Sequence, residues 1–259
     1  MSSNTSSTNK IYLIVYEVDL GYHVIEAHSD KRLAETRLEY FLSNSNPNEY
    51  CIEEFTLGQL NHLEKLGKKA NYIIPYGSRV YEVIDEESDY NVAVISTDPT
   101  LEDTVCEPHS KIEYKIINKN DYQTLLDSQD IVAIEVYFCE SYFARGNLKN
   151  LQVDYSYKVD KKKICEVFTE KSNNCWVECK NKLTQVVGQD RPALKSLFHS
   201  FRILYFGIQL CTHGKIVDYK EANHIYDEIM KIGADWEQLD KHFKPLYDAL
   251  YLEFKKATE

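Results

Sequence analysis

The first part of the chain alternates short runs rich in Ile, Val and Tyr with polar turns, a pattern typical of short strands. These runs predict strands over 11–18, 22–27 and 50–55. Leucine and aromatic residues at helical spacing predict one helix over 31–42, between the second and third strands. We therefore expect a small ββαβ module over 10–56. The Ser/Thr/Asn-rich residues 1–9 are expected to be a disordered tail.

The middle of the chain mixes apolar runs with helical patterns and polar loops. Strands are predicted over 72–76, 89–96, 111–117 and 131–138. Helices are predicted over 57–69 and 79–84, and from Asn120 or Asp121 to 128, with a polar loop over 97–110. This order of elements predicts one domain over 57–158, with a mixed sheet and flanking helices in an α+β layout.

From residue 159 onward the apolar positions recur at helical spacing. Helices are predicted over 161–169, 174–186, 192–213, 222–232 and 236–256, of which the first two are either continuous or separate. Pro192 suits the first turn of the long third helix, and Gly214 suits the position after its end. Its expected core positions are Leu194, Leu197, Phe198, Phe201, Leu204 and Tyr205. We expect a C-terminal helical subdomain over 159–259.

The composition is that of an ordinary globular protein, with 43% hydrophobic and 27% charged residues among 259. A net charge of −11 argues against coating of duplex DNA. The sequence has no apolar run near the roughly 20 residues that cross a bilayer, so no membrane partner is expected. Seven cysteines without Cys-x-x-Cys spacing predict reduced thiols and a cytoplasmic or nuclear location.

One basic stretch interrupts the acidic chain at the start of the predicted helical subdomain. Its lysines are Lys158, Lys161, Lys162, Lys163, Lys171, Lys180 and Lys182. An acidic protein with one basic stretch fits a small anionic ligand better than duplex DNA. Two interpretations of the stretch stay open, an exposed helix face and a track for a polynucleotide strand.

The chemically most informative residues begin at a Gly-Ser pair. Gly77-Ser78 follows an apolar run, and Asp89 opens the next apolar run together with Asn91. Glycine lets backbone N–H groups approach phosphate oxygens. Side chains at positions i and i+2 of a strand point to the same face, so Asp89 and Asn91 are expected to share one site.

A third acidic ligand has two candidates in later runs. Glu113 lies in the predicted strand over 111–117 and is the first choice. Glu135 lies in the apolar run over 131–138 and needs a partner if it is buried. For Glu135 the alternative is a structural ion pair with Arg202 or Lys195.

This set of residues resembles the nucleotidyltransferases of the DNA polymerase beta superfamily, over about residues 57–255. Such enzymes transfer a nucleoside monophosphate from an NTP to a hydroxyl group, on an RNA end, a protein or a small molecule. The resemblance implies Mg²⁺ or Mn²⁺ held by Asp89, Asn91 and Glu113, with two-metal chemistry. It also implies that Gly77, Ser78 and Arg79 cradle the phosphates.

The chain departs from the superfamily pattern at Asn91, where an Asp or Glu normally stands. An amide oxygen is neutral and binds a metal more weakly than a carboxylate does. Two functions stay open: an active nucleotidyltransferase, or a catalytically degenerate nucleotide- or RNA-binding protein that acts as a sensor or scaffold. A second departure is Glu82, since related sequences often have Gly after the aromatic residue at Tyr81.

Three polar residues share one face of the predicted helix over 192–213. Lys195, His199 and Arg202 stand at positions i, i+4 and i+7. The resemblance to phage and large-DNA-virus members of the superfamily implies that they bind the triphosphate, and a solvated basic face is the alternative. We expect His199 to donate a hydrogen bond to an anion and not to act as a general base.

Overall fold

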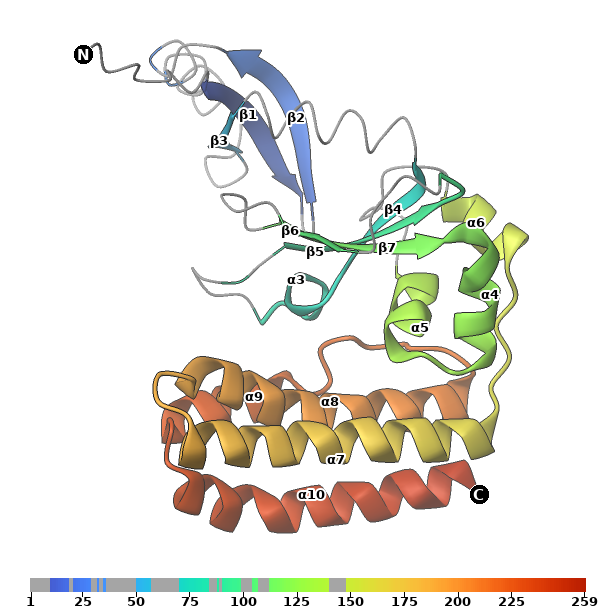
Figure 1. Ribbon diagram of the computed structural model, residues 1–259, viewed down its shortest axis with the longest axis vertical. Coiled ribbons are helices and arrows are strands. Elements are labelled where there is room, and N and C mark those ends of the chain that lie inside the picture. The colour runs from blue at the N-terminus through green and yellow to red at the C-terminus, as the bar shows by residue number, and fades with distance from the viewer. Residues whose placement is uncertain are drawn as a thin grey trace, which may run out of the picture.

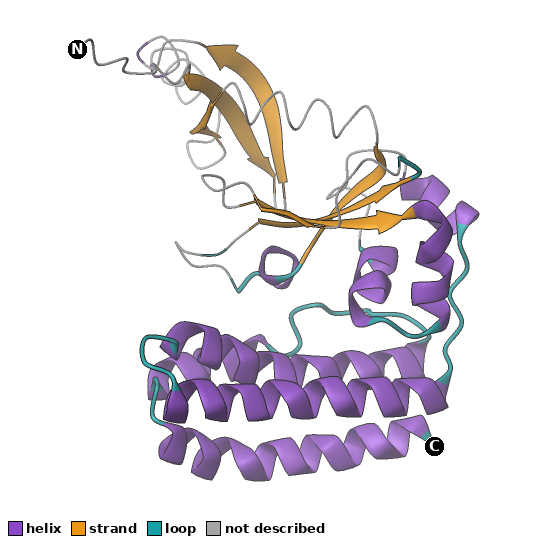
Figure 2. Ribbon diagram, viewed as in Figure 1, coloured by secondary structure: helices purple, strands orange, loops and turns teal. Residues whose placement is uncertain are grey.

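The computed structural model describes residues 10–18, 21–28, 32, 35, 50–56, 70–83, 88, 90–98, 104–106, 112–139 and 148–259. These residues form an α+β structure with two sheets and a set of long C-terminal helices (Figures 1 and 2). The predicted tail over 1–9 and the predicted helix over 57–69 lie outside the described residues. Of the helix predicted over 31–42, Arg32 and Glu35 are described, and both are helical.

The first sheet contains the three strands predicted near the N-terminus. They are β1 (Lys10–Val18), β2 (Gly21–His28) and β3 (Tyr50–Thr56). The order is β2-β1-β3, and both pairs are antiparallel. The strand predictions for this region are therefore confirmed.

The second sheet has four strands in the order β4-β5-β7-β6. They are β4 (Ala70–Tyr76), β5 (Tyr90–Ser96), β6 (Thr104–Cys106) and β7 (Ile112–Asn118). The β5–β7 pair is parallel and the other pairs are antiparallel, so the sheet is mixed as predicted. The loop predicted over 97–110 was wrong at β6, because those three residues pair with β7 at the sheet edge.

One face of this sheet packs into the main hydrophobic core. Its apolar side chains there are Tyr72, Ile74, Ala93, Ile95 and Ile117, all at most 5% exposed. The helices α4 (Lys119–Asp127) and α5 (Ile131–Phe138) contact the sheet, and they lie between it and the C-terminal helices (Figure 1). The register puts Tyr76, Asn91 and Glu113 in one cross-strand row beyond these apolar positions.

The strand predicted over 131–138 was wrong, because this segment is helix α5. The Asp130 side chain caps the helix by accepting a hydrogen bond from the Ala133 N–H at 2.9 Å. Gln129, in the left-handed region at φ 61°, turns the chain from α4 into α5. The middle of the helix is buried all round, at Ala133, Ile134, Glu135 and Val136. The run therefore has no polar face whose period would distinguish a helix from a strand.

The C-terminal part consists of five helices. They are α6 (Leu148–Asp154), α7 (Lys161–Gln185), α8 (Asp190–His213), α9 (Asn223–Ile232) and α10 (Trp236–Thr258). The long helices α7, α8 and α10 lie side by side (Figure 1). Helix α7 is continuous, which settles the alternative left open by the sequence.

Helix α8 is the central element of the helical part. Pro192 lies in its first turn, and Gly214 ends it with a left-handed φ of 74°, as predicted. Its predicted core residues Leu194, Leu197, Phe198, Phe201 and Leu204 are at most 6% exposed. Tyr205 is half-buried against the same core.

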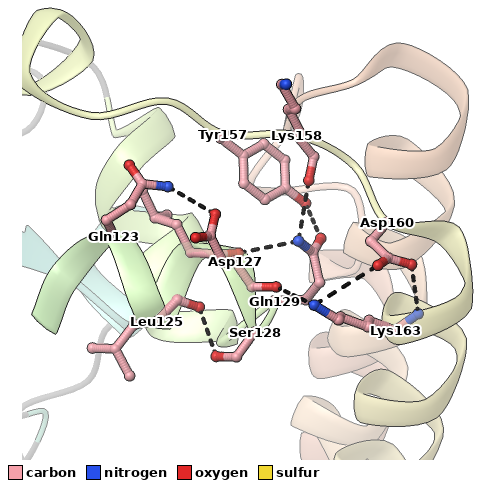
Figure 3. A network of polar contacts seen from close by, with 10 residues as sticks. Gln123, Leu125, Asp127, Ser128, Gln129, Tyr157, Lys158, Asp160 and Lys163 are labelled. Carbon is pink, nitrogen blue, oxygen red and sulfur yellow. Dashed lines mark hydrogen bonds and ion pairs between the residues drawn. The ribbon is translucent and has the colours of Figure 1, made fainter.

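A network of polar contacts fixes the chain that leads into α7 (Figure 3). The Gln129 amide donates to the Lys158 carbonyl at 3.1 Å and accepts from the Tyr157 hydroxyl at 2.7 Å. The Lys163 ammonium donates to the Asp127 carbonyl at 3.0 Å. These contacts tie the first turn of α7 to the corner between α4 and α5, so the helical part is anchored beside the sheet.

The lysines of the basic stretch are exposed, except for Lys182, which is half-buried and paired with Glu178 at 2.6 Å. Exposed acidic side chains, Glu166 and Glu170, alternate with them along α7. The described cysteines, Cys139, Cys165, Cys175, Cys179 and Cys211, are free thiols. Within the described ranges, each helix is too short or too polar to cross a bilayer.

Candidate functional site

A cleft of about 290 Å³ brings together eight of the ten residues that the sequence singled out. They are Gly77, Ser78, Asn91, Glu113, Glu135, Lys195, His199 and Arg202. The other two are Asp89, which lies outside the described residues, and Arg79, whose side chain does. The cleft is formed by the turn after β4, the starts of β5 and β7, and helices α5, α8 and α9.

The sheet wall of the cleft consists of one row across three strands. Asn91 of β5 pairs with Tyr76 of β4 on one side and with Glu113 of β7 on the other. Neighbouring strands lie about 4.8 Å apart, and paired positions direct their side chains to the same face. The amide of Asn91, half-buried, therefore lies next to the exposed carboxylate of Glu113.

Gly77 forms the turn at the end of this wall. Its φ of 83° lies in the left-handed region that favours glycine. A Cβ atom at this position would lie 3.0 Å from Nδ2 of Asn91, so the Asn91 amide packs directly on the glycine. The Gly77 carbonyl accepts hydrogen bonds from the N–H groups of Val80 and Tyr81 at 2.9 and 3.2 Å, which starts the short helix α3 (Ser78–Tyr81).

Glu82, directly after α3, has a left-handed φ of 59°. A non-glycine residue is strained in this conformation, whereas glycine would adopt it without strain. The Glu82 carboxylate forms an ion pair with Lys220, from the loop after α8. This contact connects the turn beside the cleft to the helical part.

The α8 wall of the cleft carries Lys195, His199 and Arg202. Their helical spacing puts them on one face, as predicted, and this face lines the cleft. Arg202 is 6% exposed, whereas Lys195 and His199 are half-buried. The three residues therefore differ in depth, with Arg202 innermost.

Arg202 is held by a buried carboxylate. Glu135, 2% exposed, forms an ion pair with Arg202 Nη1 through one oxygen and accepts from the Tyr81 hydroxyl through the other. The guanidinium also lies 4.1 Å from the centre of the Tyr81 ring and 5.0 Å from that of Phe206. The ion-pair interpretation of Glu135 is confirmed, and Arg202 is the partner.

The charges explain the protonation states in this network. Burial lowers the pKa of Arg202, but the carboxylate of Glu135, together with Tyr81 and Cys175, more than offsets it, so the pKa is raised. Burial, Arg202 and then Lys195 hold the pKa of His199 well below its ordinary value. His199 is therefore neutral at neutral pH. Its Nδ1 accepts a hydrogen bond from Arg202 Nε at 3.1 Å.

Several lining residues were not identified from the sequence. They are Tyr76, Tyr81, Val83, Ile131, Val132, Phe198 and Tyr226. Burial and then Glu113 raise the pKa of Tyr76 to about 12. Phe198 was assigned to the core alone, and its ring meets that of Tyr226 edge-to-face at 5.3 Å. Tyr226 belongs to α9, and the sequence carries no signal that this helix reaches the cleft.

The described residues offer a partial set of metal ligands. Among them, no cluster of three His, Cys, Asp or Glu side chains is close enough to hold a metal ion. Glu113, Asn91 and Ser78 nevertheless supply oxygen donors at one end of the cleft. Mg²⁺ typically binds one or two carboxylates and completes its shell with water and substrate phosphates. The donors present fit a magnesium ion that is shared with a phosphate ligand.

No protein-family model and no curated protein matches the chain. Among solved structures, a nucleotidyltransferase-like protein from Exiguobacterium sibiricum is distantly similar to it, at 15% sequence identity and a TM-score of 0.29. The similarity covers 77% of this chain and 72% of that one. Because this similarity is so distant, any function has to rest on the cleft itself.

Proposed function

We propose that the protein is a nucleotidyltransferase that binds a nucleoside triphosphate with Mg²⁺ or Mn²⁺ and transfers its nucleoside monophosphate to a hydroxyl group. The observation that supports this most is the pairing of two unlike walls in one cleft. Oxygen donors of Asn91 and Glu113 line the sheet side, and Lys195 and His199 line the helix side. A metal-bound triphosphate requires both kinds of group.

The charges around the cleft imply that a nucleotide binds as its metal complex. Glu113 and Glu135 are balanced by Lys195 and Arg202, and His199 is neutral. A triphosphate carries several negative charges, which this balanced lining does not neutralise. Divalent cations must therefore enter with the ligand. The cleft volume of about 290 Å³ lies near the lower end of ligand pockets and suits the phosphates.

Each residue has a distinct task in this proposal. Ser78 and the backbone around Gly77 bind phosphate oxygens, while Lys195 neutralises charge and His199 donates a hydrogen bond. Asp89 and Glu113 hold the cation and Asn91 is a weaker ligand, whereas both oxygens of Glu135 are already occupied. Bound Mg²⁺ would activate the acceptor hydroxyl and stabilise the departing pyrophosphate.

A second candidate function is nucleotide or RNA binding without transfer, as a sensor or scaffold. The amide at Asn91 favours it, because a neutral ligand weakens the metal site on which transfer depends. The close packing of this amide on Gly77 also limits how far it can move toward a metal. Transfer and binding have to be measured separately to distinguish the two functions.

The test is a transfer assay with each of the four NTPs, labelled at the α-phosphate, with Mg²⁺ or Mn²⁺ and either RNA or protein acceptors. We expect label transfer that Asp89→Ala and Glu113→Gln abolish and that Asn91→Asp increases. Glu178→Gln, in an exposed ion pair on α7, is the matched control and should leave transfer unchanged. Metal-dependent NTP binding without transfer would favour the second function. Absence of transfer, of NTP binding and of RNA binding would overturn both functions.

A further inference from the structure

Four side chains from three helices form a continuous chain of hydrogen bonds in the wall of the cleft. The Tyr81 hydroxyl of α3 and Arg202 Nη1 of α8 both donate to Glu135 of α5. Arg202 then donates from Nε to Nδ1 of His199, one turn earlier on α8. The chain of hydrogen bonds therefore runs from the buried carboxylate of Glu135 to the half-buried ring of His199.

The direction of the last bond fixes the tautomer of His199. Arginine Nε always carries a proton and cannot accept, so Nδ1 of His199 must be the acceptor. A neutral imidazole with an unprotonated Nδ1 carries its proton on Nε2. Because Nδ1 is used by Arg202, Nε2 is the ring nitrogen that remains for a ligand in the cleft.

We infer that Arg202 is a positioning residue, which Glu135 and Tyr81 hold in place and which fixes His199 as a neutral Nε2–H donor to a phosphate oxygen. The inference rests on the proposed function for the identity of the ligand, but not for the tautomer. Arg202 has another bond from Nη1, and it stacks on Tyr81, so its guanidinium has little freedom to leave His199.

The surroundings of His199 keep this donor uncharged. Arg202 and Tyr81 contact the His199 ring, and the other titratable or charged groups that line the cleft with it are Lys195 of α8, Glu135 of α5, Glu113 of β7, and Tyr76 and Tyr226. Burial and the two neighbouring cations lower the pKa of His199. His199 should therefore stay neutral as the pH falls through about 6.5, the ordinary value for histidine.

The direct test is the tautomer in the full-length protein without nucleotide. Two-bond ¹H–¹⁵N spectra of ¹⁵N-labelled protein distinguish protonated from unprotonated ring nitrogens, and loss of one signal in His199→Gln assigns it. We expect an unprotonated Nδ1 and a protonated Nε2 from pH 8 to pH 6. A protonated Nδ1, or titration near pH 6.5, would overturn the inference without any variant of Arg202.

A mutant cycle tests the consequence for binding. Arg202→Lys keeps a cation beside Glu135 but removes the Nε–H, and we expect it to weaken Mg–ATP binding about tenfold, the size of one charge-assisted hydrogen bond. In His199→Gln the amide donates without help from Arg202, so adding Arg202→Lys there should change Kd by less than about twofold. If Arg202→Lys weakens Mg–ATP binding equally in the wild-type and the His199→Gln backgrounds, the role of Arg202 is merely structural and the inference is overturned.

The two proposals fail in different ways. If the wild-type protein shows the expected tautomer but does not bind Mg–ATP, the proposed function fails, while the positioning of His199 by Arg202 stands. If Mg–ATP binds and the tautomer is the opposite one, the inference fails and the proposed function stands.

Discussion

At the residue scale, the turn at Gly77 decides how closely the end of β4 packs against the Asn91 side chain. In Gly77→Ala, alanine would have to adopt the left-handed φ of Gly77, which is strained for it, and its methyl group would lie 3.0 Å from the Asn91 amide. We expect a loss of about 2 kcal/mol in the free energy of unfolding, measured by urea denaturation, together with weaker nucleotide binding.

Gly188 provides the matched control for that substitution. Its φ of 77° is similar, but a Cβ there would have no neighbour within 4 Å. Gly188→Ala should cost only the backbone strain, about 1 kcal/mol, and should leave nucleotide affinity unchanged. If both substitutions lower the free energy of unfolding by the same amount, the contact between Gly77 and Asn91 contributes nothing to stability.

Glu82 offers a prediction of the opposite sign. Its φ of 59° is strained, and its ion pair with Lys220 is partly exposed to solvent. Glu82→Gly should therefore raise the free energy of unfolding by about 0.5–1 kcal/mol. Glu82→Gln, which removes the charge but keeps the strain, should be neutral or destabilising. A stabilisation by Glu82→Gln that equals that of Glu82→Gly would contradict this explanation.

Eight of the residues that line the cleft were predicted from the sequence, while their roles stay predictions. The spacing on α8 put Lys195, His199 and Arg202 on one face, but the resemblance to the nucleotidyltransferases was needed to join them to Asn91 and Glu113 in one site. The partner of Arg202 was not determined by the sequence, because it depends on how α5 packs against α8. Tyr226 was missed for the same reason.

At the scale of elements, the Glu135–Arg202 pair joins α5 to α8. Glu135→Ala leaves the buried guanidinium without its carboxylate, and we expect it to cost about 3–5 kcal/mol in thermal or urea unfolding. Replacing both residues by Met should recover most of that loss. Glu178→Ala, in an exposed pair, should cost less than about 1 kcal/mol. If Glu135→Ala costs no more than Glu178→Ala, the pair does not hold these helices together.

Helix α8 packs closely against α7 and α10 at Gly207. A Cβ there would lie 2.4 Å from Phe254 of α10 and 3.1 Å from Phe168 of α7, and both rings are buried. Gly207→Ala should therefore destabilise the protein by about 1–3 kcal/mol, although alanine has the higher helix propensity. Phe254→Leu in the same chain should relieve part of the clash. A stabilising Gly207→Ala would show that the helices separate at little cost.

Helix α5 shows where prediction from the sequence fails at this scale. The run Ile131–Phe138 is buried almost all round, so it lacks the polar face that reveals a helical period. The usable signal was Asp130, a good N-cap residue directly before the run. Long helices with mixed faces were predicted closely, as the ends of α8 at Asp190 and Gly214 show.

At the scale of the whole molecule, the cleft exists only because the sheet and the helical part stay in place. The polar network around Gln129 fixes the chain between them (Figure 3). The Glu82–Lys220 ion pair joins them again near the cleft. Under the proposed function, the balanced charges of the described lining residues require a nucleotide to bind together with a divalent cation.

Calorimetric titration of ATP into the wild-type protein, with Mg²⁺ and with EDTA, tests this central claim most directly. Binding should occur with Mg²⁺ and be lost with EDTA, and Glu113→Gln should weaken it at least about tenfold, whereas Glu178→Gln should not change it. ATP binding that is equally strong in EDTA, or that is unchanged in Glu113→Gln, would contradict a metal–nucleotide site in this cleft.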